Sequence, residues 1–300
     1  MGQEGYFVFI VLNNILWGDT FMGPSVVVRN LSAKYIGSDT WTVRAVDLQV
    51  NKGEMVVIMG PSGCGKTTLF RILAGLVPSL IPGTVEGEVT VEGVDVVRAG
   101  YKQLVGVVGL VYQNPEMQVI TRSVIEELAM GPENLGLSRE EIQKRIDWVT
   151  HVLNLYDLLD KDPQSLSGGE KQLIAIASVL TIKPKVLLLD EPTSMLDHRG
   201  TRLVLEAINQ LKKEGLTILV AEHRVEWAVE AADRVAVMGR GTILLEGKPE
   251  EVFSRVEDIQ RYGVRPPGIA EVAYELRKKG IDIPIPVKLE DSLKFGVGSK

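Results

Sequence analysis

The chain has 300 residues, of which 45% are hydrophobic and 24% charged, a composition typical of a globular protein of one large or two modest domains. Its net charge of −6 argues against an extended nucleic-acid surface, so we expect no nucleic-acid partner. Cys64 is the one cysteine, which excludes a disulfide within the chain and suits a reducing compartment.

The N-terminal segment is apolar from Tyr6 to Trp17 apart from two asparagines. It is shorter than the ~20 residues that span a bilayer, and no lysine or arginine precedes it as in a secretory signal. Two interpretations are open: the segment contacts a membrane surface or a partner, or translation starts at Met22. We favour the second and treat residues 1–24 as an extension. We expect no transmembrane helix elsewhere, so a membrane role depends on partners.

The first third of the chain reads as short strands, because β-branched residues alternate or run together between turn residues. The run MVVIMG predicts a buried strand and is followed by a helical pattern, KTTLFRILAGL. Strands are predicted over residues 25–35, 41–50, 55–60, 86–96 and 104–113.

Residues 114–165 form a mostly helical insertion, in which apolar residues between 142 and 156 recur at the spacing of a helix face. Ser138 and Glu141 predict a capping box at the start of that helix. Beyond the insertion, helices and strands alternate, which favours an α/β fold with a largely parallel sheet. The predicted helices are 170–181, 199–215 and 265–280, and the predicted strands are 185–190, 216–223 and 233–247.

The stretch GPSGCGKTT fits the phosphate-loop pattern GxxxxGK[ST] and lies between a predicted strand and a helix. Its glycines let backbone N–H groups turn toward phosphates, Lys66 reaches the β- and γ-phosphates, and Thr67 offers a hydroxyl to Mg²⁺. The alternative, a glycine turn that only caps a helix, fits this context less well. The nucleotide-binding residues of the stretch are Gly60, Pro61, Ser62, Gly63, Cys64, Gly65, Lys66, Thr67 and Thr68.

Two adjacent carboxylates follow the apolar run VLLL. Asp190, at the end of a buried strand, suits a Walker B carboxylate for Mg²⁺, and Glu191 is placed to orient or deprotonate a water that attacks the γ-phosphate. An acidic turn after a strand is the weaker alternative, because a phosphate loop lies upstream.

The stretch LSGGEKQ, residues 166–172, predicts a second capping box between Ser167 and Glu170. Gly168 and Gly169 leave backbone N–H groups exposed at the positive end of the helix. A capped helix without further role is the alternative reading of this stretch alone.

These motifs, in this order, resemble the ATP-binding-cassette (ABC) ATPases over about Ser25–Pro249. The resemblance implies an α/β, P-loop NTPase nucleotide-binding domain with an antiparallel β subdomain, a RecA-like parallel-sheet core and a helical subdomain at about 114–165. We therefore assign residues 25–250 to the ABC ATPase domain. Residues 251–300 form a C-terminal extension, either a second dimer contact or a loosely packed surface helix.

The resemblance implies roles for further residues. Tyr35 takes the place of the aromatic residue that stacks on adenine, with Trp41 as a rival better read as a packing residue. Gln113 matches the Q-loop glutamine at the Mg²⁺ or the attacking water. SMLD, ending at Asp197, matches the D-loop, and His223 in AEHR matches the switch histidine near the γ-phosphate.

In the resembled family the signature closes over the nucleotide of a second subunit, so Ser167 and Gly169 act in trans. One chain has one phosphate loop and one signature, and it therefore needs a second ABC ATPase subunit, a copy of itself or a paralogue. Two ATP molecules are then held between two head-to-tail chains, and hydrolysis is linked to their opening and closing.

Length separates the classes within this superfamily. Roughly 50 residues lie between Gln113 and the signature, without heptad runs, which excludes a DNA-repair head split by a coiled coil. Translation-type proteins carry two cassettes in a longer chain. A transporter motor remains, with another ABC importer or a soluble ATPase of the iron–sulfur assembly type as alternatives.

Four stretches resemble energy-coupling factor (ECF) transporters, with small departures at Tyr112 and Met195. This resemblance implies a transmembrane scaffold protein, a membrane protein that captures a vitamin or transition metal, and a peripheral position at the cytoplasmic face of the membrane. It also predicts that residues 114–120, including Gln118, line the groove for the scaffold. The stretches are YQNPEMQVI, IEELAMGPENLGLS, AEHRVEWAVEAADRVAVM and GVRPPGIAEVAYELRKKGIDIP.

Overall fold

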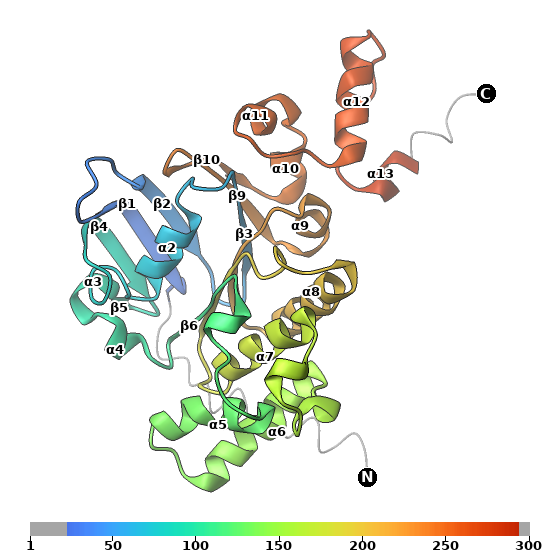
Figure 1. Ribbon diagram of the computed structural model, residues 1–300. Helices are drawn as coiled ribbons and strands as arrows, with labels where there is room; N and C mark the ends of the chain where they lie inside the picture. Colours follow the sequence, from blue (N-terminus) through green and yellow to red (C-terminus); the bar gives the residue numbers. More distant parts are fainter. Residues whose placement is uncertain (1–22, 294–300) are drawn as a thin grey trace.

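The computed structural model describes residues 23–293, so the apolar N-terminal segment and Met22 lie outside the described residues. Two sheets organise the fold, one antiparallel and one mostly parallel, with helices beside them (Figure 1). No helix in the described range is both long and apolar enough to cross a membrane.

The smaller sheet is antiparallel and has the order β2-β1-β4-β5. This sheet is the expected antiparallel subdomain, built from the strand patterns that precede and follow the phosphate loop. Its strands are β1 (Val26–Tyr35), β2 (Val43–Val50), β4 (Gly83–Val91) and β5 (Val94–Asp95).

The larger sheet has the order β10-β9-β3-β8-β7-β6 and is parallel except for the edge strand β10, which pairs antiparallel with β9. It is the expected parallel core. Its strands are β3 (Met55–Met59), β6 (Val108–Val111), β7 (Val186–Asp190), β8 (Thr217–Ala221), β9 (Arg234–Gly239) and β10 (Thr242–Gly247).

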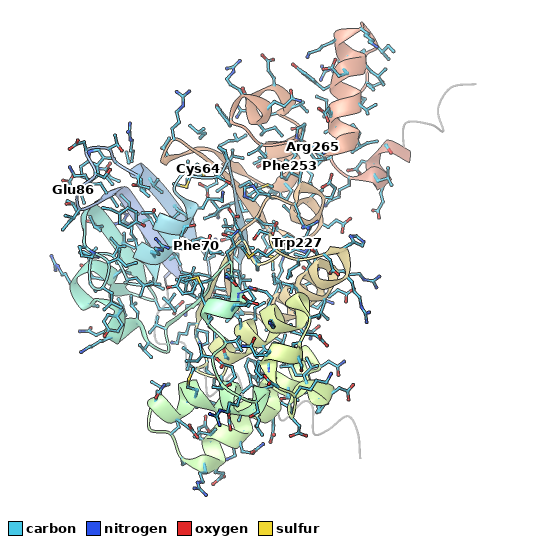
Figure 2. All side chains as sticks on the ribbon, in the orientation of Figure 1. Cys64, Phe70, Glu86, Trp227, Phe253 and Arg265 are labelled. Atoms are coloured by element: carbon cyan, nitrogen blue, oxygen red, sulfur yellow. The ribbon has the colours of Figure 1, made fainter. Side chains whose placement is uncertain are left out.

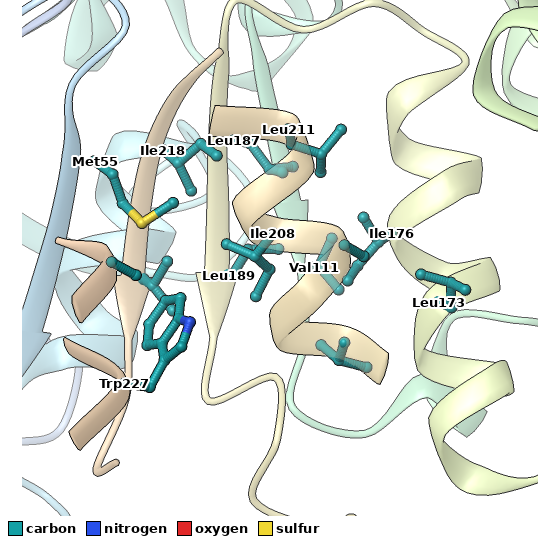
Figure 3. Packing of buried hydrophobic residues seen from close by; sticks show 14 of the residues in the cluster. Met55, Val111, Leu173, Ile176, Leu187, Leu189, Ile208, Leu211, Ile218 and Trp227 are labelled. Carbon is teal, nitrogen blue, oxygen red and sulfur yellow. The ribbon is translucent and has the colours of Figure 1, made fainter. Parts of the chain in front are cut away.

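The central strands are buried on both faces, which explains why their sequences are continuous apolar runs. On β3, Met55 belongs to one hydrophobic cluster and its neighbour Val56 to the other, because successive side chains point to opposite faces. On one face, Leu187 and Leu189 of β7 pack with Ile208 of helix α8, His198–Lys213 (Figure 3).

The other face of the parallel sheet packs on the antiparallel sheet and on helix α2 (Lys66–Leu73), which follows the phosphate loop. Cys64 and Phe70 belong to this cluster and lie beside that sheet (Figure 2). Two short helices, α3 (Val96–Ala99) and α4 (Tyr101–Leu104), complete this side of the molecule.

Helices dominate the region after β6, as expected. Ser138 caps α6 by accepting a hydrogen bond from the backbone of Glu141, but the Glu141 side chain binds Arg145 and Lys183 instead of closing the predicted capping box. The elements are η1 (Pro115–Met117), α5 (Val124–Asn134), α6 (Arg139–Leu153), η2 (Tyr156–Leu158), η3 (Pro163–Ser165), α7 (Gly168–Leu180), α8 (His198–Lys213) and α9 (Val225–Ala231).

The C-terminal segment forms α10 (Pro249–Phe253), α11 (Val256–Arg261), α12 (Gly268–Lys278) and α13 (Leu289–Leu293). Only α12 was predicted, because the other three are too short to display a periodic apolar pattern. Helix α12 projects from the body of the molecule (Figure 1), with Val272 exposed along it.

The packing of β6 against α7 predicts the effect of Gly109→Ala. A Cβ atom at Gly109 would lie 2.4 Å from Cγ1 of Val179 and 3.0 Å from Cγ of Pro184. We expect this overpacking to lower the free energy of unfolding by about 1–3 kcal/mol, measured by urea denaturation. Gly268→Ala is the control, because nothing lies within 4 Å of a Cβ at that position. Equal stability of the two variants would contradict the packing described here.

Candidate active site

The phosphate loop and three further groups of predicted site residues meet at one edge of the parallel sheet. The phosphate loop follows β3, His223 follows β8, Asp190 ends β7 and Gln113 follows β6, and these four strands are consecutive neighbours. Since parallel strands present their carboxyl ends at the same edge, segments far apart in the sequence come together there, where ligands bind in open α/β sheets.

The phosphate loop requires glycine at two positions for steric reasons. A Cβ atom at Gly60, whose φ is +152°, would lie 2.0 Å from the carbonyl oxygen of Met238. At Gly65 a Cβ would meet the carbonyl oxygen of Thr42 at 2.8 Å. Gly63 differs, since it is exposed and has open space around its Cα. The loop is therefore packed on one side and open on the other, as a phosphate cradle must be.

Cys64 is buried inside this loop, and burial raises the pKa of its thiol. A neutral buried thiol is a poor nucleophile, so Cys64 has a packing role.

Lys66 lies nearly buried at the centre of the site, with 4% of its side chain exposed. Its Nζ donates a hydrogen bond to the carbonyl oxygen of Gly60 at 2.8 Å and a longer one to that of Pro61. The same atom lies 3.3 Å from Oε1 of Glu191. The ammonium group therefore connects the phosphate loop with the end of β7.

Asp190 is 5% exposed and hydrogen-bonds to Thr67, the residue after the phosphate-loop lysine. Burial raises the pKa of Asp190, although the hydrogen bond from Thr67 opposes this shift. The oxygen Oδ1 of Asp190 is buried and has no hydrogen-bond partner. A carboxylate oxygen left unpaired beside a hydroxyl is a donor set that fits Mg²⁺, which prefers oxygen ligands.

Glu191 has a left-handed backbone, with φ of 49°, which is unfavourable for a residue that has a side chain. Its Oε1 lies 2.9 Å from Nε2 of His223. Burial raises the pKa of Glu191, but the hydrogen bond with His223 and the positive charge of Lys66 outweigh burial, so the net pKa lies below its ordinary value. Glu191 is therefore held as an ionised carboxylate.

Gln113 is exposed at the end of β6, at the same edge as Asp190. The next residues do not all face solvent as the groove hypothesis requires. Gln118 is turned inward: its Oε1 accepts from the backbone N–H of Tyr112, and its Nε2 donates to the carbonyl of Leu110. The side chain of Gln118 therefore stabilises the strand end, and its place in the groove stays a prediction.

The exposed apolar residues of this loop are Met117 and Ile120, with 78% and 70% of their surface accessible. Exposing large apolar side chains to water is unfavourable. Met117 and Ile120 are therefore better candidates than Gln118 for contact with a partner.

The predicted capping box at the signature is confirmed, with both of its hydrogen bonds present between Ser167 and Glu170. Ser167 and Gly168 are exposed, whereas Gly169 packs so closely on Gly200 of α8 that a Cβ would lie 2.4 Å from its Cα. Within residues 23–293, the side-chain hydrogen bonds of Ser167 go to Glu170 and none goes to the phosphate loop.

Two aromatic residues compete for the adenine position. The hydroxyl of Tyr35 lies 3.1 Å from that of Thr68 and accepts from Arg71, so Tyr35 stands directly beside α2. Trp41 has the ammonium group of Lys34 over its ring at 5.2 Å.

The exposed Asp197, the predicted D-loop residue, caps α8: its side chain accepts a hydrogen bond from the backbone N–H of Gly200.

Two functional candidates were missed from the sequence. Gln172 of α7 is fully buried and donates to the carbonyl of Tyr112, which links the signature helix to the loop of Gln113. Glu222 is buried at the end of β8, next to His223. A carboxylate directly after four apolar residues was the available signal, because a buried charge must find partners.

Comparison with known proteins agrees with this geometry. Residues 43–194 match the family model described as ABC transporter. The chain belongs to the ABC transporter ATPase family. It is therefore an ATP-binding subunit that hydrolyses ATP, and its two sheets and helical region form the ABC fold.

Relatives of this ABC ATPase cover most of its length. A Pyrococcus abyssi protein with a provisional name as an ABC transporter ATP-binding protein is 47% identical over 85% of this chain and 92% of its own. The ECF transporter ATP-binding protein EcfA1 of Caldanaerobacter subterraneus is 40% identical over 84% and 90%.

Solved structures are also similar to this ABC ATPase. CbiO1 of Clostridium perfringens, described as part of the ABC transporter complex CbiONQ, has a TM-score of 0.70 at 32% identity, covering 80% of this chain and 94% of its own. The cassette MJ0796, solved as a dimer with ADP and phosphate, has a TM-score of 0.64 at 27% identity, covering 75% and 98%.

The pKa of Glu191 predicts a pH-dependent stability difference between the wild type and Glu191→Gln. Because its folded pKa is lowered, ionised Glu191 contributes stability that is present above the ordinary value of 4.5 and is lost as the pH falls through the lowered pKa. We expect the wild type to lose its advantage over the range in which the pH falls from above 4.5 through the lowered pKa. Urea unfolding across this range measures the difference in free energy of unfolding between the wild type and Glu191→Gln.

Glu246→Gln provides a control of opposite sign. Burial raises the pKa of Glu246 despite its ion pair with Arg234, so the wild type should lose stability relative to this variant as the pH rises. The same trend in both variants would contradict the shift assigned to Glu191.

Proposed function

We propose that this ABC ATPase energises a membrane importer of the ECF type, which takes up a vitamin or a transition metal. The observation that carries the hydrolytic part is the contact of Glu191 with both Lys66 and His223 at the sheet edge. The similarity to EcfA1 and to CbiO1 supports the ECF type. The protein would then act as a peripheral subunit at the cytoplasmic face of the membrane.

In this proposal the phosphate loop holds the triphosphate of ATP. The open side of the loop and the N-terminus of α2 supply backbone N–H groups, and Lys66 moves its ammonium group from the Gly60 carbonyl to the phosphates. Tyr35 stacks on the adenine, because it borders α2 beside the loop. Thr67, Asp190 and Gln113 hold Mg²⁺, which neutralises phosphate charge when bound.

Glu191 is the group that accepts a proton from the attacking water. The water oxygen forms a bond to the γ-phosphorus, and the bond to the bridging oxygen breaks, which yields ADP and phosphate. Since Glu191 is held ionised by Lys66 and His223, it can accept a hydrogen bond from that water and orient it. His223 then lies where it can contact the γ-phosphate.

The proposed working unit is a head-to-tail dimer, with a copy of this chain or a paralogue as partner. Ser167, Gly168 and Asp197 are exposed, as residues that contact a partner's nucleotide must be. Gly169 places the start of α7 against α8, so the signature and the D-loop residue Asp197 move together. The positive end of α7 adds electrostatic stabilisation when the dimer closes.

Glu191→Gln tests the hydrolytic proposal. The amide keeps the shape of the side chain but cannot take up a proton, so we expect ATP binding with turnover reduced by about 100-fold or more. The variant should form a stable dimer in Mg·ATP, detected by size-exclusion chromatography with light scattering. A variant that hydrolyses ATP at the wild-type rate would contradict the role of Glu191, and one that stays monomeric would contradict the sandwich dimer.

The proposed contact with the scaffold is formed by Met117 and Ile120. Both side chains are exposed on the loop between Gln113 and α5, so a scaffold helix seated there would sense movement of the catalytic edge.

In the domain arrangement that we propose, residues 25–250 form the ATPase with a helical subdomain at 114–165, and residues 251–300 add a second dimer contact.

The double variant Met117→Ser/Ile120→Ser should weaken binding of the ATPase to the scaffold and leave basal ATP hydrolysis intact. Both substitutions remove apolar contact area, and neither residue is part of the proposed nucleotide site. We expect co-purification with the scaffold from membranes to drop by about tenfold or more, since buried anchors dominate interfaces. Leu80→Ser, at another exposed apolar residue, is the control. Retention of scaffold binding by the double variant would contradict this contact, and absence of any scaffold with the wild type would contradict the ECF assignment.

A further inference from the structure

Glu222 is the last residue before His223, and only 3% of its surface is exposed. It follows the buried strand β8, whose neighbours β3 and β7 carry the phosphate loop and Glu191. Its backbone N–H donates to the carbonyl of Ile58 on β3, which fixes its place in the sheet. The proposed chemistry assigns nothing to this carboxylate.

The carboxylate of Glu222 accepts two hydrogen bonds from opposite directions. The hydroxyl of Thr193 donates to Oε2 at 2.8 Å, and the backbone N–H of His223 donates to Oε1 at 3.0 Å. Thr193 is itself fully buried, and its Oγ1 accepts from Nε of Arg224 at 3.1 Å. One side chain thus joins the segment after β7 to the segment after β8.

The segment after β7 needs such an anchor. A left-handed backbone at a residue such as Glu191 is strained and persists only where the surroundings enforce it. The backbone N–H of Glu191 is held by the carbonyl of Ala221, and Thr193 holds the chain two residues later. The partners of both hydrogen bonds, Ala221 and Glu222, lie at the end of β8, so this strand end holds the chain at Glu191 and again just after it.

Purely structural needs do not call for a carboxylate here. Burying a charge is costly, and an apolar residue at the end of β8 would pack without that cost. In the part of the chain that the structure describes, no ion pair to Lys, Arg or His compensates Glu222. Its hydrogen bonds go instead to the two segments that carry Glu191 and His223.

We propose that Glu222 is a positioning residue for hydrolysis, which holds the Glu191 segment and the His223 backbone at the separation that places Oε1 of Glu191 and Nε2 of His223 2.9 Å apart. This inference rests on the proposed roles of Glu191 and His223. Glu222 acts through them and touches neither ATP nor the attacking water.

Two matched pairs of variants test the inference. Glu222→Met and Thr193→Val remove the hydrogen bonds with little change of shape. Thr193→Ser keeps the hydroxyl donor, and Glu222→Gln keeps one oxygen that can accept from the backbone of His223 and an amide that can donate to the Thr193 hydroxyl. We expect kcat for ATP to fall by about 10- to 100-fold in the first pair, because small displacements of reacting groups cost that much. KM for ATP should stay within about twofold, since the phosphate loop is intact.

The second pair should retain kcat within about threefold of the wild type. The double variant Glu222→Met/Thr193→Val should lose less than the product of the two single effects, because both single variants remove the hydrogen bond between Thr193 and Glu222. Glu54→Met is the control for loss of a partly buried carboxylate: it removes an ion pair with Arg234 at the opposite end of β3. We expect it to lower the melting temperature without lowering kcat.

The assay includes Glu191→Gln, so that two failures can be told apart. If Glu191→Gln keeps wild-type turnover, the proposed catalytic role fails and Glu222 has no group to position. If Glu191→Gln is inactive but Glu222→Met and Thr193→Val keep wild-type kcat, the catalytic role stands and the positioning role is overturned. If the melting temperatures of Glu222→Met and Thr193→Val fall but their kcat does not, Glu222 has a structural role only and the positioning role is likewise overturned.

Discussion

One oxygen atom, Oε1 of Glu191, connects the catalytic edge of the sheet. It lies 3.3 Å from Nζ of Lys66 and 2.9 Å from Nε2 of His223, so residues that follow three neighbouring strands meet at one point. This contact forms only if the strands keep their register, because a shift of one residue would turn each side chain to the other face. Burial of both faces of the parallel sheet enforces that register.

The same edge is connected to the helical region by polar contacts of α7. Gln172 donates to the carbonyl of Tyr112, and Lys171 lies 3.3 Å from Glu116 in the loop beyond Gln113. The signature begins α7, so a displacement of the signature reaches the residue that follows β6. The buried amide contact is short-range and directional, whereas the ion pair is partly exposed and contributes little to stability. Gln172 therefore carries most of this connection.

Sequence patterns predicted the elements of this site but not its tertiary contacts. The phosphate loop, Asp190, Glu191 and the Ser167–Glu170 capping box depend on residues close together in the chain, and such local rules can be read directly. The backbone hydrogen bonds of Gln118 were not predicted, because a polar side chain in a loop can face solvent or return to the backbone, and only the fold decides between these. Helices α10, α11 and α13 were missed because they are too short to show a period.

Glu222 shows most clearly what the sequence leaves undetermined. The run before it predicts a buried strand end, and a buried carboxylate must have partners, but the partner Thr193 lies 29 residues earlier, in the turn after β7. Only the pairing of β7 with β8 brings these two residues together. An ATPase of this kind needs a strained, charged edge on an apolar sheet, and buried hydrogen bonds such as this one supply the rigidity that apolar packing, being non-directional, does not. The geometry of the site thus depends on contacts between different strands, whereas its chemical groups belong to short motifs within single segments of the sequence.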